Sequence, residues 1–445
     1  MTMRKSSITV AMVLAVVALI WVPLQPATGQ GAQQDQQKPT YTLPEYNAFQ
    51  ACRAETNAQA RVKCLDDFVA KFPQSTLMQY VYTLYYTTYN ELKNYAKTIE
   101  YADKYVALGD KVDVASRLQA IQTRIQLFPY ALNIKAADAN DQLTKERDAA
   151  LLGAKLLGAF PKPANSTATD AQFAEQKKPG IAFFYVAVGF ADFSLKDYEA
   201  AIQAYKTALS NNPNDAVTEY RLGLAYLQMT PPQSLDGFWA LARAINQKIP
   251  DDAKVKDYLR KAMLNYEQLS CESLVDAQLS ELLQLAMGSA DRPATYTIPS
   301  TADLQKIAQS STIVTLLNDL QAGGDKAKMT WLALCGLDFP EVAGKVIDVK
   351  PGTDFVELHM FTSASAEEMQ AATTANMDVK VPGQPEAKNI QKEDGIRFSG
   401  TLSSYDPPPA FMLHWDKAKV NPEDISAAAP GKHTPHKVPP KNPGT

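Results

Sequence analysis

The sequence predicts a mostly α-helical protein, a solenoid of antiparallel helix hairpins, followed by a small all-β domain near the C-terminus. From Pro44 to about Gly323, apolar residues recur at three- and four-residue spacing, which is the period of helices with one buried face. Proline and glycine interrupt this pattern repeatedly, as expected where turns separate paired helices. After about Gly344, apolar and polar residues alternate, which is typical of strands.

The length and composition fit a folded protein of about two or three domains. The chain has 445 residues, of which 46% are apolar and 21% are charged, and its net charge is −4. Proteins that bind nucleic acid usually carry a strong basic excess, so this charge argues against a nucleic-acid partner. We therefore expect a protein or peptide partner.

The first residues predict an export signal. Arg4 and Lys5 precede an apolar run from Ile8 to Val22, and the small residues of Ala27-Thr28-Gly29 follow it. This is the order of charged, apolar and cleavage regions in a signal peptide, so we expect residues 1–29 to be removed from a periplasmic or secreted protein. The alternative is an uncleaved anchor, although the run is short for a bilayer. No second long apolar run follows, so we expect no stable membrane span after cleavage.

Export would place the four cysteines in an oxidising compartment, where they can form disulfides. Cys52 and Cys64 lie near the two sides of a predicted helix hairpin, within bridging reach, which would leave Cys271 and Cys335 to pair. Four cysteines allow three pairings, and the sequence does not choose among them. None has the close doublet spacing of a zinc site, so we interpret them as structural.

A 34-residue period marks the middle of the helical region. Gly189 and Gly223 lie 34 residues apart, and each follows an apolar residue. Small residues are needed where two helix backbones approach closely, and aromatic residues fill the space beside them. The positions of this kind are Gly189, Tyr198, Ala201, Tyr205, Ala208 and Pro213 in one unit, and Leu222, Gly223, Tyr226 and Pro250 in the next.

This pattern resembles the tetratricopeptide (TPR) repeat, and the chain resembles exported TPR proteins of the bacterial envelope. The second closing proline comes 37 residues after the first rather than 34, and we place the extra residues in the turn at 230–232. Residues 45–110 resemble the repeat less closely, and the hairpins expected at 112–160 and 254–289 lack its motif. Residues 161–179 are predicted to form a loop or a break in the stack.

The resemblance implies a binding surface. In TPR proteins the first helix of each hairpin lines a concave groove that suits an extended peptide or a helix. The side chains at these positions are apolar here, whereas peptide-binding members place Lys, Arg and Asn there to clamp a terminal carboxylate. We therefore expect an apolar partner; the alternative is that the chain's own helices fill the groove. The implied lining residues are Phe183, Val186, Phe190, Phe193, Tyr220, Leu224 and Leu227.

The C-terminal part contains five strand-like runs, 345–350, 355–361, 377–381, 396–402 and 411–420. Five strands with a glycine in a bent strand predict a small, partly open barrel. Residues 395–420 resemble the oligonucleotide/oligosaccharide-binding (OB) fold, including its anticodon-binding-like branch. The resulting organisation is a signal peptide (1–29), a polar linker (30–43), a TPR-like domain (44–290), a helical connector (291–343), an OB-like barrel (344–426) and a disordered basic tail (427–445).

The chain offers few residues for catalysis. The predicted helical body contains no histidine, and no nucleophile elbow, P-loop or zinc-protease motif occurs. His359 and His414 lie in strands that could be neighbours, with Glu357 and Asp416 two residues from them. These four could bind a metal, but solvent-facing side chains on a sheet are the commoner arrangement. We therefore expect no catalytic residue, metal or cofactor.

The sequence thus predicts an exported scaffold or adaptor that binds partner proteins through an apolar groove, and not an enzyme. The alternative is a module for oligosaccharide or single-stranded nucleic acid, centred on the barrel. Such a module needs aromatic residues with nearby cations. The candidates are Tyr405, Trp415, Lys417 and Lys419.

Overall fold

A computed structural model describes residues 41–427 of the chain. The expected signal peptide, most of the expected linker and nearly all of the expected tail, including His433 and His436, lie outside the described residues. The chain divides into two compact units after Asp252. The helices that we assigned to the repeat domain up to residue 290 therefore include some that belong to the second unit.

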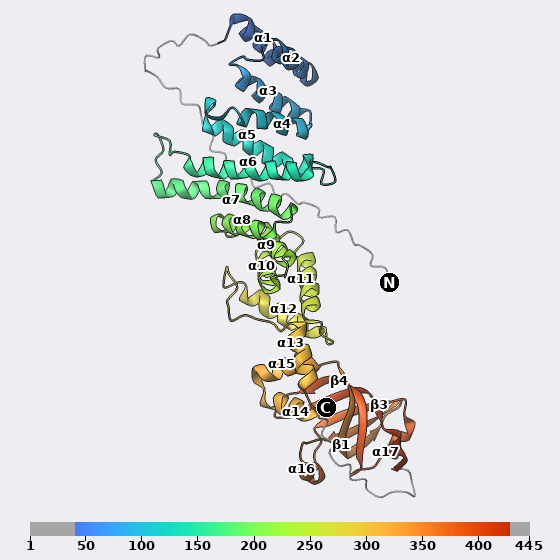
Figure 1. Cartoon of the computed structure of the whole chain (residues 1–445). Helices are drawn as coiled ribbons and strands as arrows, with labels where there is room; N and C mark the ends of the chain where they lie inside the picture. The colour runs from blue at the N-terminus through green and yellow to red at the C-terminus, as the bar shows by residue number, and fades with distance from the viewer. Residues whose placement is uncertain (1–40, 428–445) are drawn as a thin grey trace. The chain divides into compact units, whose positions relative to one another are not determined.

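The first unit is a stack of helix hairpins. Its helices follow one another in space in the order of the chain, and the extensive helix–helix contacts join sequence neighbours (Figure 1). This is the connectivity of a solenoid. The helices are α1 (Leu43–Ala54), α2 (Ala58–Lys71), α3 (Met78–Glu91), α4 (Tyr95–Val106), α5 (Val114–Ala131), α6 (Ala139–Ala159), α7 (Asp170–Ser194), α8 (Tyr198–Asn211), α9 (Ala216–Gln228) and α10 (Ser234–Asn246), with a short 3₁₀ turn at Gly109–Lys111.

Side-chain caps fix where several of these helices begin. Asn94 accepts a hydrogen bond from the backbone N–H of Lys97 at 3.2 Å, and Asp197 accepts one from Ala200 at 3.1 Å. Such caps satisfy N–H groups that have no partner within the helix. Lys93 and Lys196, in the turns just before these two caps, adopt positive φ angles of 56° and 66°. The hairpin turns are therefore set by local chemistry.

The prediction of a loop over 161–179 was wrong at its C-terminal end. Thr169 and Gln172 form a capping box, and α7 begins at Asp170 with Pro179 inside it. This first part of α7 packs on α6: the Lys177 Nζ atom donates to the Gly158 carbonyl at 2.7 Å. Tertiary contacts and a strong cap thus outweigh the cost of a proline in the helix.

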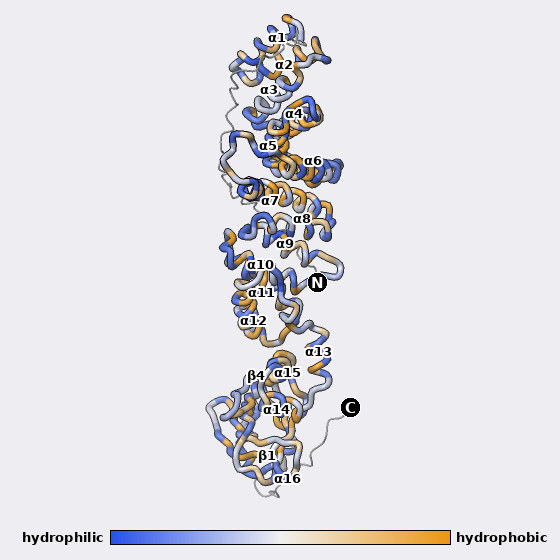
Figure 2. The backbone as a smooth tube through the Cα atoms, turned by 90° about the vertical axis from the view of Figure 1, so that its left-hand side faces the viewer, coloured by the Kyte–Doolittle hydropathy of each residue, from blue (hydrophilic) through white to orange (hydrophobic). Residues whose placement is uncertain are grey.

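The apolar interior of the first unit is divided into several clusters rather than one centre. One cluster joins α1, α2 and α3 around Leu65 and Phe68, and another joins α5, α6 and α7 around Ile121 and Phe184. Hydrophobic residues accordingly recur along the stack, as the orange segments in α5 and α7 show (Figure 2). Each hairpin therefore buries its apolar face against the next hairpin.

The second unit begins with helices that lead into the β domain. Those helices continue to Leu334, and the first strand starts at Asp338, which is earlier than the expected boundary at 344. In the described residues, no helix of either unit is long and apolar enough to cross a membrane. The helices are α11 (Asp252–Glu267), α12 (Ser273–Leu285), α13 (Thr301–Ser310), α14 (Ile313–Ala322) and α15 (Gly324–Leu334), and two further short helices, α16 (Ala366–Ala371) and α17 (Pro422–Ala427), accompany the strands.

The strands form a closed barrel in the order β1-β2-β3-β5-β4, with β1 hydrogen-bonded to both β2 and β4. We predicted a partly open barrel. The β3–β5 pair is parallel and the other pairs are antiparallel, and this arrangement fits an OB-like barrel. The strands are β1 (Asp338–Pro351), β2 (Phe355–Phe361), β3 (Met377–Pro382), β4 (Gly395–Asp406) and β5 (Met412–Val420), and a 3₁₀ helix, η2 (Pro385–Asn389), links β3 to β4.

Two disulfides connect neighbouring elements. Cys52 of α1 is bonded to Cys64 of α2, with their Cα atoms 5.3 Å apart. Cys271, between α11 and α12, is bonded to Cys335, which directly follows α15. The second disulfide therefore ties the helices of the second unit to the start of the barrel.

Candidate functional site

The repeat motif places a glycine of α7 against an aromatic ring of α8. A Cβ atom on Gly189 would lie 2.5 Å from the Cε1 atom of Tyr205. Tyr205 is buried, and burial raises the pKa of its hydroxyl above the ordinary value. Ala201 and Ala208, on the same helix, are also buried. Small residues therefore allow α7 and α8 to approach closely, as the motif predicts.

In the second repeat unit, too, a glycine lies where two helices approach closely. A Cβ atom on Gly223 of α9 would lie 2.8 Å from Leu241 and 3.0 Å from the carbonyl oxygen of Gly237, both on α10. Leu222 and Tyr226 are buried beside it, and Tyr198 is partly buried in the first repeat. Pro213 and Pro250 are exposed in the turns that follow α8 and α10.

The close contact at Gly189 predicts an unusual response to alanine. Gly189→Ala gains helix propensity of about 1 kcal/mol, but the added methyl group overpacks against the buried ring. We expect a net loss of about 1–2 kcal/mol in the free energy of unfolding, measured by urea denaturation followed by circular dichroism. Gly158→Ala in α6 is the matched control, because its Cβ would meet nothing within 4 Å. Equal stabilisation by both substitutions would contradict the packing argument.

The seven groove residues implied by the resemblance are all partly buried, and none is fully buried or fully exposed. Phe190 packs against the cluster that contains Phe128 and Leu143, and Phe193 packs against the cluster that contains Tyr226. The chain's own helices thus cover part of this apolar surface. The remaining part is accessible to solvent.

Charged groups link several helices of the first unit. Arg124 of α5 is buried, and its guanidinium binds Glu146 of α6 and, at 2.7 Å, Asp103 of α4. Arg243 of α10 binds Glu219 of α9 at 2.5 Å. These pairs satisfy charges inside the stack, and we assign them a structural role.

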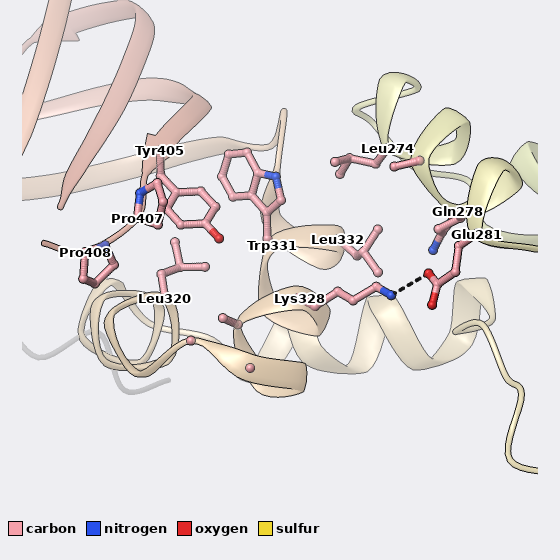
Figure 3. A pocket seen from close by; sticks show the side chains of 14 residues that line it. Leu274, Gln278, Glu281, Leu320, Lys328, Trp331, Leu332, Tyr405, Pro407 and Pro408 are labelled. Carbon is pink, nitrogen blue, oxygen red and sulfur yellow. Dashed lines mark hydrogen bonds and ion pairs between the residues drawn. The ribbon is translucent and has the colours of Figure 1, made fainter. Parts of the chain in front are cut away.

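An open hollow of about 380 Å³ lies in the second unit (Figure 3). The indole of Trp331 and the ring of Tyr405 meet edge to face in its wall, with their centroids 4.8 Å apart. The Lys328 Nζ atom lies 3.0 Å from the Glu281 Oε2 atom (Figure 3). Its walls come from α12, α14, α15, the end of β4 and the segment after β4: Leu274, Ala277, Gln278, Glu281, Leu320, Gly323, Gly324, Ala327, Lys328, Trp331, Leu332, Tyr405, Pro407 and Pro408.

A buried carboxyl group lies behind one wall of this hollow. The Gln278 Nε2 atom donates to the Glu267 Oε1 atom at 2.8 Å. Burial raises the pKa of Glu267 to about 7, because desolvation disfavours its charged form. The hollow therefore combines an apolar, aromatic surface with a few polar groups, which suits non-covalent binding of an apolar group.

The structure corrects part of the hypothesis that aromatic residues of the barrel stack on a ligand. Trp415 is only 1% exposed, and it packs inside the barrel against Phe339 and Phe398. It is therefore not available to stack on a ligand. Lys417 and Lys419 are exposed, and Tyr405 faces the hollow described above.

The two strand histidines lie on the outer face of the barrel, where they share a partner that the sequence analysis missed. Asp378 of β3 lies between His359 of β2 and His414 of β5 in register. Glu357 is close to His359, whereas Asp416 is exposed and His414 instead contacts Asp406. Only the pairing of β3 with both strands brings Asp378 to this place, and that pairing is not readable from local sequence.

One known family matches part of the helical region. Residues 189–229 match the family described as the TPR repeat. The chain is also similar in structure to the C-terminal part of a TPR repeat-containing protein from Cytophaga hutchinsonii, with 16% sequence identity and a TM-score of 0.24. That similarity covers 55% of this chain and 93% of the other. A search of curated proteins found no match.

The match at residues 189–229 includes the close contact between Gly189 and Tyr205 and extends through α9. The same small-residue packing recurs where Gly223 meets α10. Residues 189–229 of this chain therefore match a TPR repeat within a TPR-like arrangement of helices, and the C-terminal closed barrel fits an OB-like barrel.

Proposed function

We propose that the chain is an exported scaffold or adaptor that binds partner proteins without catalysing a reaction. TPR repeats support protein interaction, and proteins that contain them are generally non-enzymatic scaffolds. The binding surface that we propose is the apolar face defined by Phe183, Val186, Phe190, Phe193, Tyr220, Leu224 and Leu227, which we call the α7–α9 face.

The observation that carries this proposal is the partial exposure of all seven side chains. Each has apolar surface still in contact with water, and burial of such surface contributes about 25 cal/mol per Å². The residues come from the first helices of two consecutive repeats, so they can act on one partner. An apolar segment, such as one face of an amphipathic helix, is the partner that fits this chemistry.

Export is proposed from the sequence and from the cysteines. The charged, apolar and small-residue regions of residues 4–29 have the order of a signal peptide. All four cysteines are paired in disulfides, and disulfides persist in oxidising compartments. We therefore propose that the protein acts in the periplasm or outside the cell.

The test of the α7–α9 face compares capture of envelope proteins by the wild type and by a Val186→Asp plus Leu224→Asp variant. Both side chains are partly exposed, so the charges should repel an apolar partner without unfolding the stack. Substitution of Phe190 would be less informative, because Phe190 packs against a core cluster. We expect at least one captured protein to decrease by about tenfold or more, which corresponds to about 1.4 kcal/mol of binding free energy.

The matched control is Gln203→Asp, an exposed position on α8. Capture by this variant should equal that of the wild type, and circular dichroism should be the same for all three proteins. Unchanged capture by the folded double variant would place the interaction surface elsewhere.

A further inference from the structure

One wall of the hollow in the second unit is aromatic and remains in contact with solvent. Trp331 of α15 and Tyr405 at the end of β4 are both partly exposed. Pro407 and Pro408, which follow β4, are exposed beside them, and Leu320 of α14 lies below the Tyr405 ring (Figure 3). Ring surface that faces water in a hollow favours the binding of an apolar segment.

This aromatic wall also carries two hydrogen-bond donors. Among the described residues, neither the Trp331 indole N–H nor the Tyr405 hydroxyl has a hydrogen-bond partner. Both groups reach solvent, because the two side chains are partly exposed and their polar atoms are not buried. A segment that fits this wall must therefore offer backbone carbonyl acceptors next to apolar side chains.

A polyproline II (PPII) segment has this chemistry. Its backbone makes no internal hydrogen bonds, so its carbonyl oxygens are free to accept them from a partner. It has three residues per turn, which brings two prolines at positions i and i+3 to the same side. Segments with this proline spacing dock in aromatic-lined grooves and enter them with little loss of conformational entropy.

The chain contains such a segment in residues 428–445, which lie outside the described residues. Residues 437–443 are KVPPKNP, in which Pro440 and Pro443 have the i and i+3 spacing. Residues 428–445 include five prolines and three lysines and no acidic residue, whereas residues 253–427 contain 24 acidic and 16 basic residues. The opposite charges favour association of the segment with the second unit.

The segment is long enough to reach the hollow of its own molecule. The last described helix, α17, ends at Ala427 and packs on the start of β4, where the Arg397 backbone N–H donates to the Asp424 Oδ2 atom at 2.8 Å. Tyr405 lies eight residues further along β4, which is about 26 Å in a strand. Pro440 lies 13 residues beyond Ala427, which spans about 40 Å in the PPII conformation.

We propose that residues 437–443 bind as a PPII segment in the hollow of the same molecule. Pro440 and Pro443 pack against the aromatic wall, and carbonyl groups of the segment accept hydrogen bonds from its two ring donors. Lys437 pairs with Glu281, an exposed residue that binds Lys328 through its Oε2 atom. The chain thereby covers apolar surface that the described residues leave in water.

The test follows the indole N–H resonance of Trp331 in the ¹⁵N-labelled full chain, identified with a Trp331→Phe variant. We expect this resonance to differ between the wild type and a Pro440→Ala plus Pro443→Ala variant, because the variant loses the contacts of the segment with the ring. Trp239 and Trp415 are 2% and 1% exposed, so their resonances should stay in place and report an intact fold.

A synthetic peptide of residues 428–445 tests the same contact by addition. Added to the full-length Pro440→Ala plus Pro443→Ala variant, it should move the Trp331 resonance saturably to its wild-type position. A peptide with Lys437→Ala should bind about two- to fivefold more weakly, which is the value of one exposed ion pair. A peptide that carries the two alanines should produce no saturable change.

The matched control is a Pro430→Ala plus Pro435→Ala variant, which also removes two prolines but leaves residues 437–443 intact. Its Trp331 resonance should have the wild-type position. The proposal would be overturned by the same resonance position in the wild type and the Pro440→Ala plus Pro443→Ala variant, or by an equal change in the matched control. A wild-type resonance that moves towards the variant position on dilution would also overturn it, because the segment would then occupy a second copy of the chain.

Discussion

Replacement of Arg124 by methionine is expected to destabilise the first unit by about 3–5 kcal/mol. Arg124 is 1% exposed and joins three consecutive helices, because it lies on α5 and binds Asp103 of α4 and Glu146 of α6. Glu146 is also 1% exposed. Loss of the guanidinium would leave this carboxyl group buried without its cation, which is among the most costly changes in a protein interior.

The double variant Arg124→Met plus Glu146→Met separates the value of the ion pair from the cost of breaking it. Replacement of both charges by apolar side chains is expected to restore most of the lost stability, since neither charge then remains buried alone. Urea unfolding gives the free energies, and hydrogen exchange of peptides from α4, α5 and α6 shows whether the loss is local. A double variant as unstable as the single one would show that packing, and not charge, dominates at this site.

The repeat was predictable because its signals are local and periodic. Gly189 and Tyr205 lie in one helix hairpin, and the spacing of small, aromatic and turn residues is sufficient to place them in contact. The closing prolines Pro213 and Pro250 likewise mark turns that the structure contains. No such motif surrounds Arg124, whose partners Asp103 and Glu146 are 21 and 22 residues away on neighbouring helices. That triad becomes visible only when the rotation of each helix is known.

In the barrel, too, local patterns were predictable and long-range strand pairings were not. The alternation of apolar and polar residues predicted β2 with the bounds that the structure shows, because each inward residue of this strand is apolar. The alternation alone did not show which face of β5 is inside. Trp415 was therefore a candidate for ligand stacking in the alternative function, although it shares the buried face of Leu413. The start of β1 was also missed, because its pairing with β4 shifts register between Phe339 and Val342, which interrupts the pattern. The position of Asp378 between the two histidines was not predictable, because it depends on the long-range pairing of three strands.

Removal of the disulfide between Cys271 and Cys335 is expected to have the second large effect. The bond joins residues 64 positions apart, and closure of a loop of this length in the unfolded chain corresponds to about 4 kcal/mol of stability. It also holds the α11–α12 connection against the residues that enter β1, where Cys335 is buried. The variant Cys271→Ala plus Cys335→Ala avoids placing a hydroxyl group at the buried position.

The other disulfide provides the comparison. Cys52 and Cys64 are 12 positions apart, so Cys52→Ala plus Cys64→Ala should cost about 3 kcal/mol and should act on the first unit. Hydrogen exchange assigns each loss to its unit: faster exchange in β1 and α12 is expected for the 271–335 variant, and faster exchange in α1 and α2 for the 52–64 variant. Hydrogen exchange in β1 and α12 that is as slow in the 271–335 variant as in the wild type would contradict this prediction. In that case the packing of α15, and not the disulfide, would hold the start of β1 to the helices.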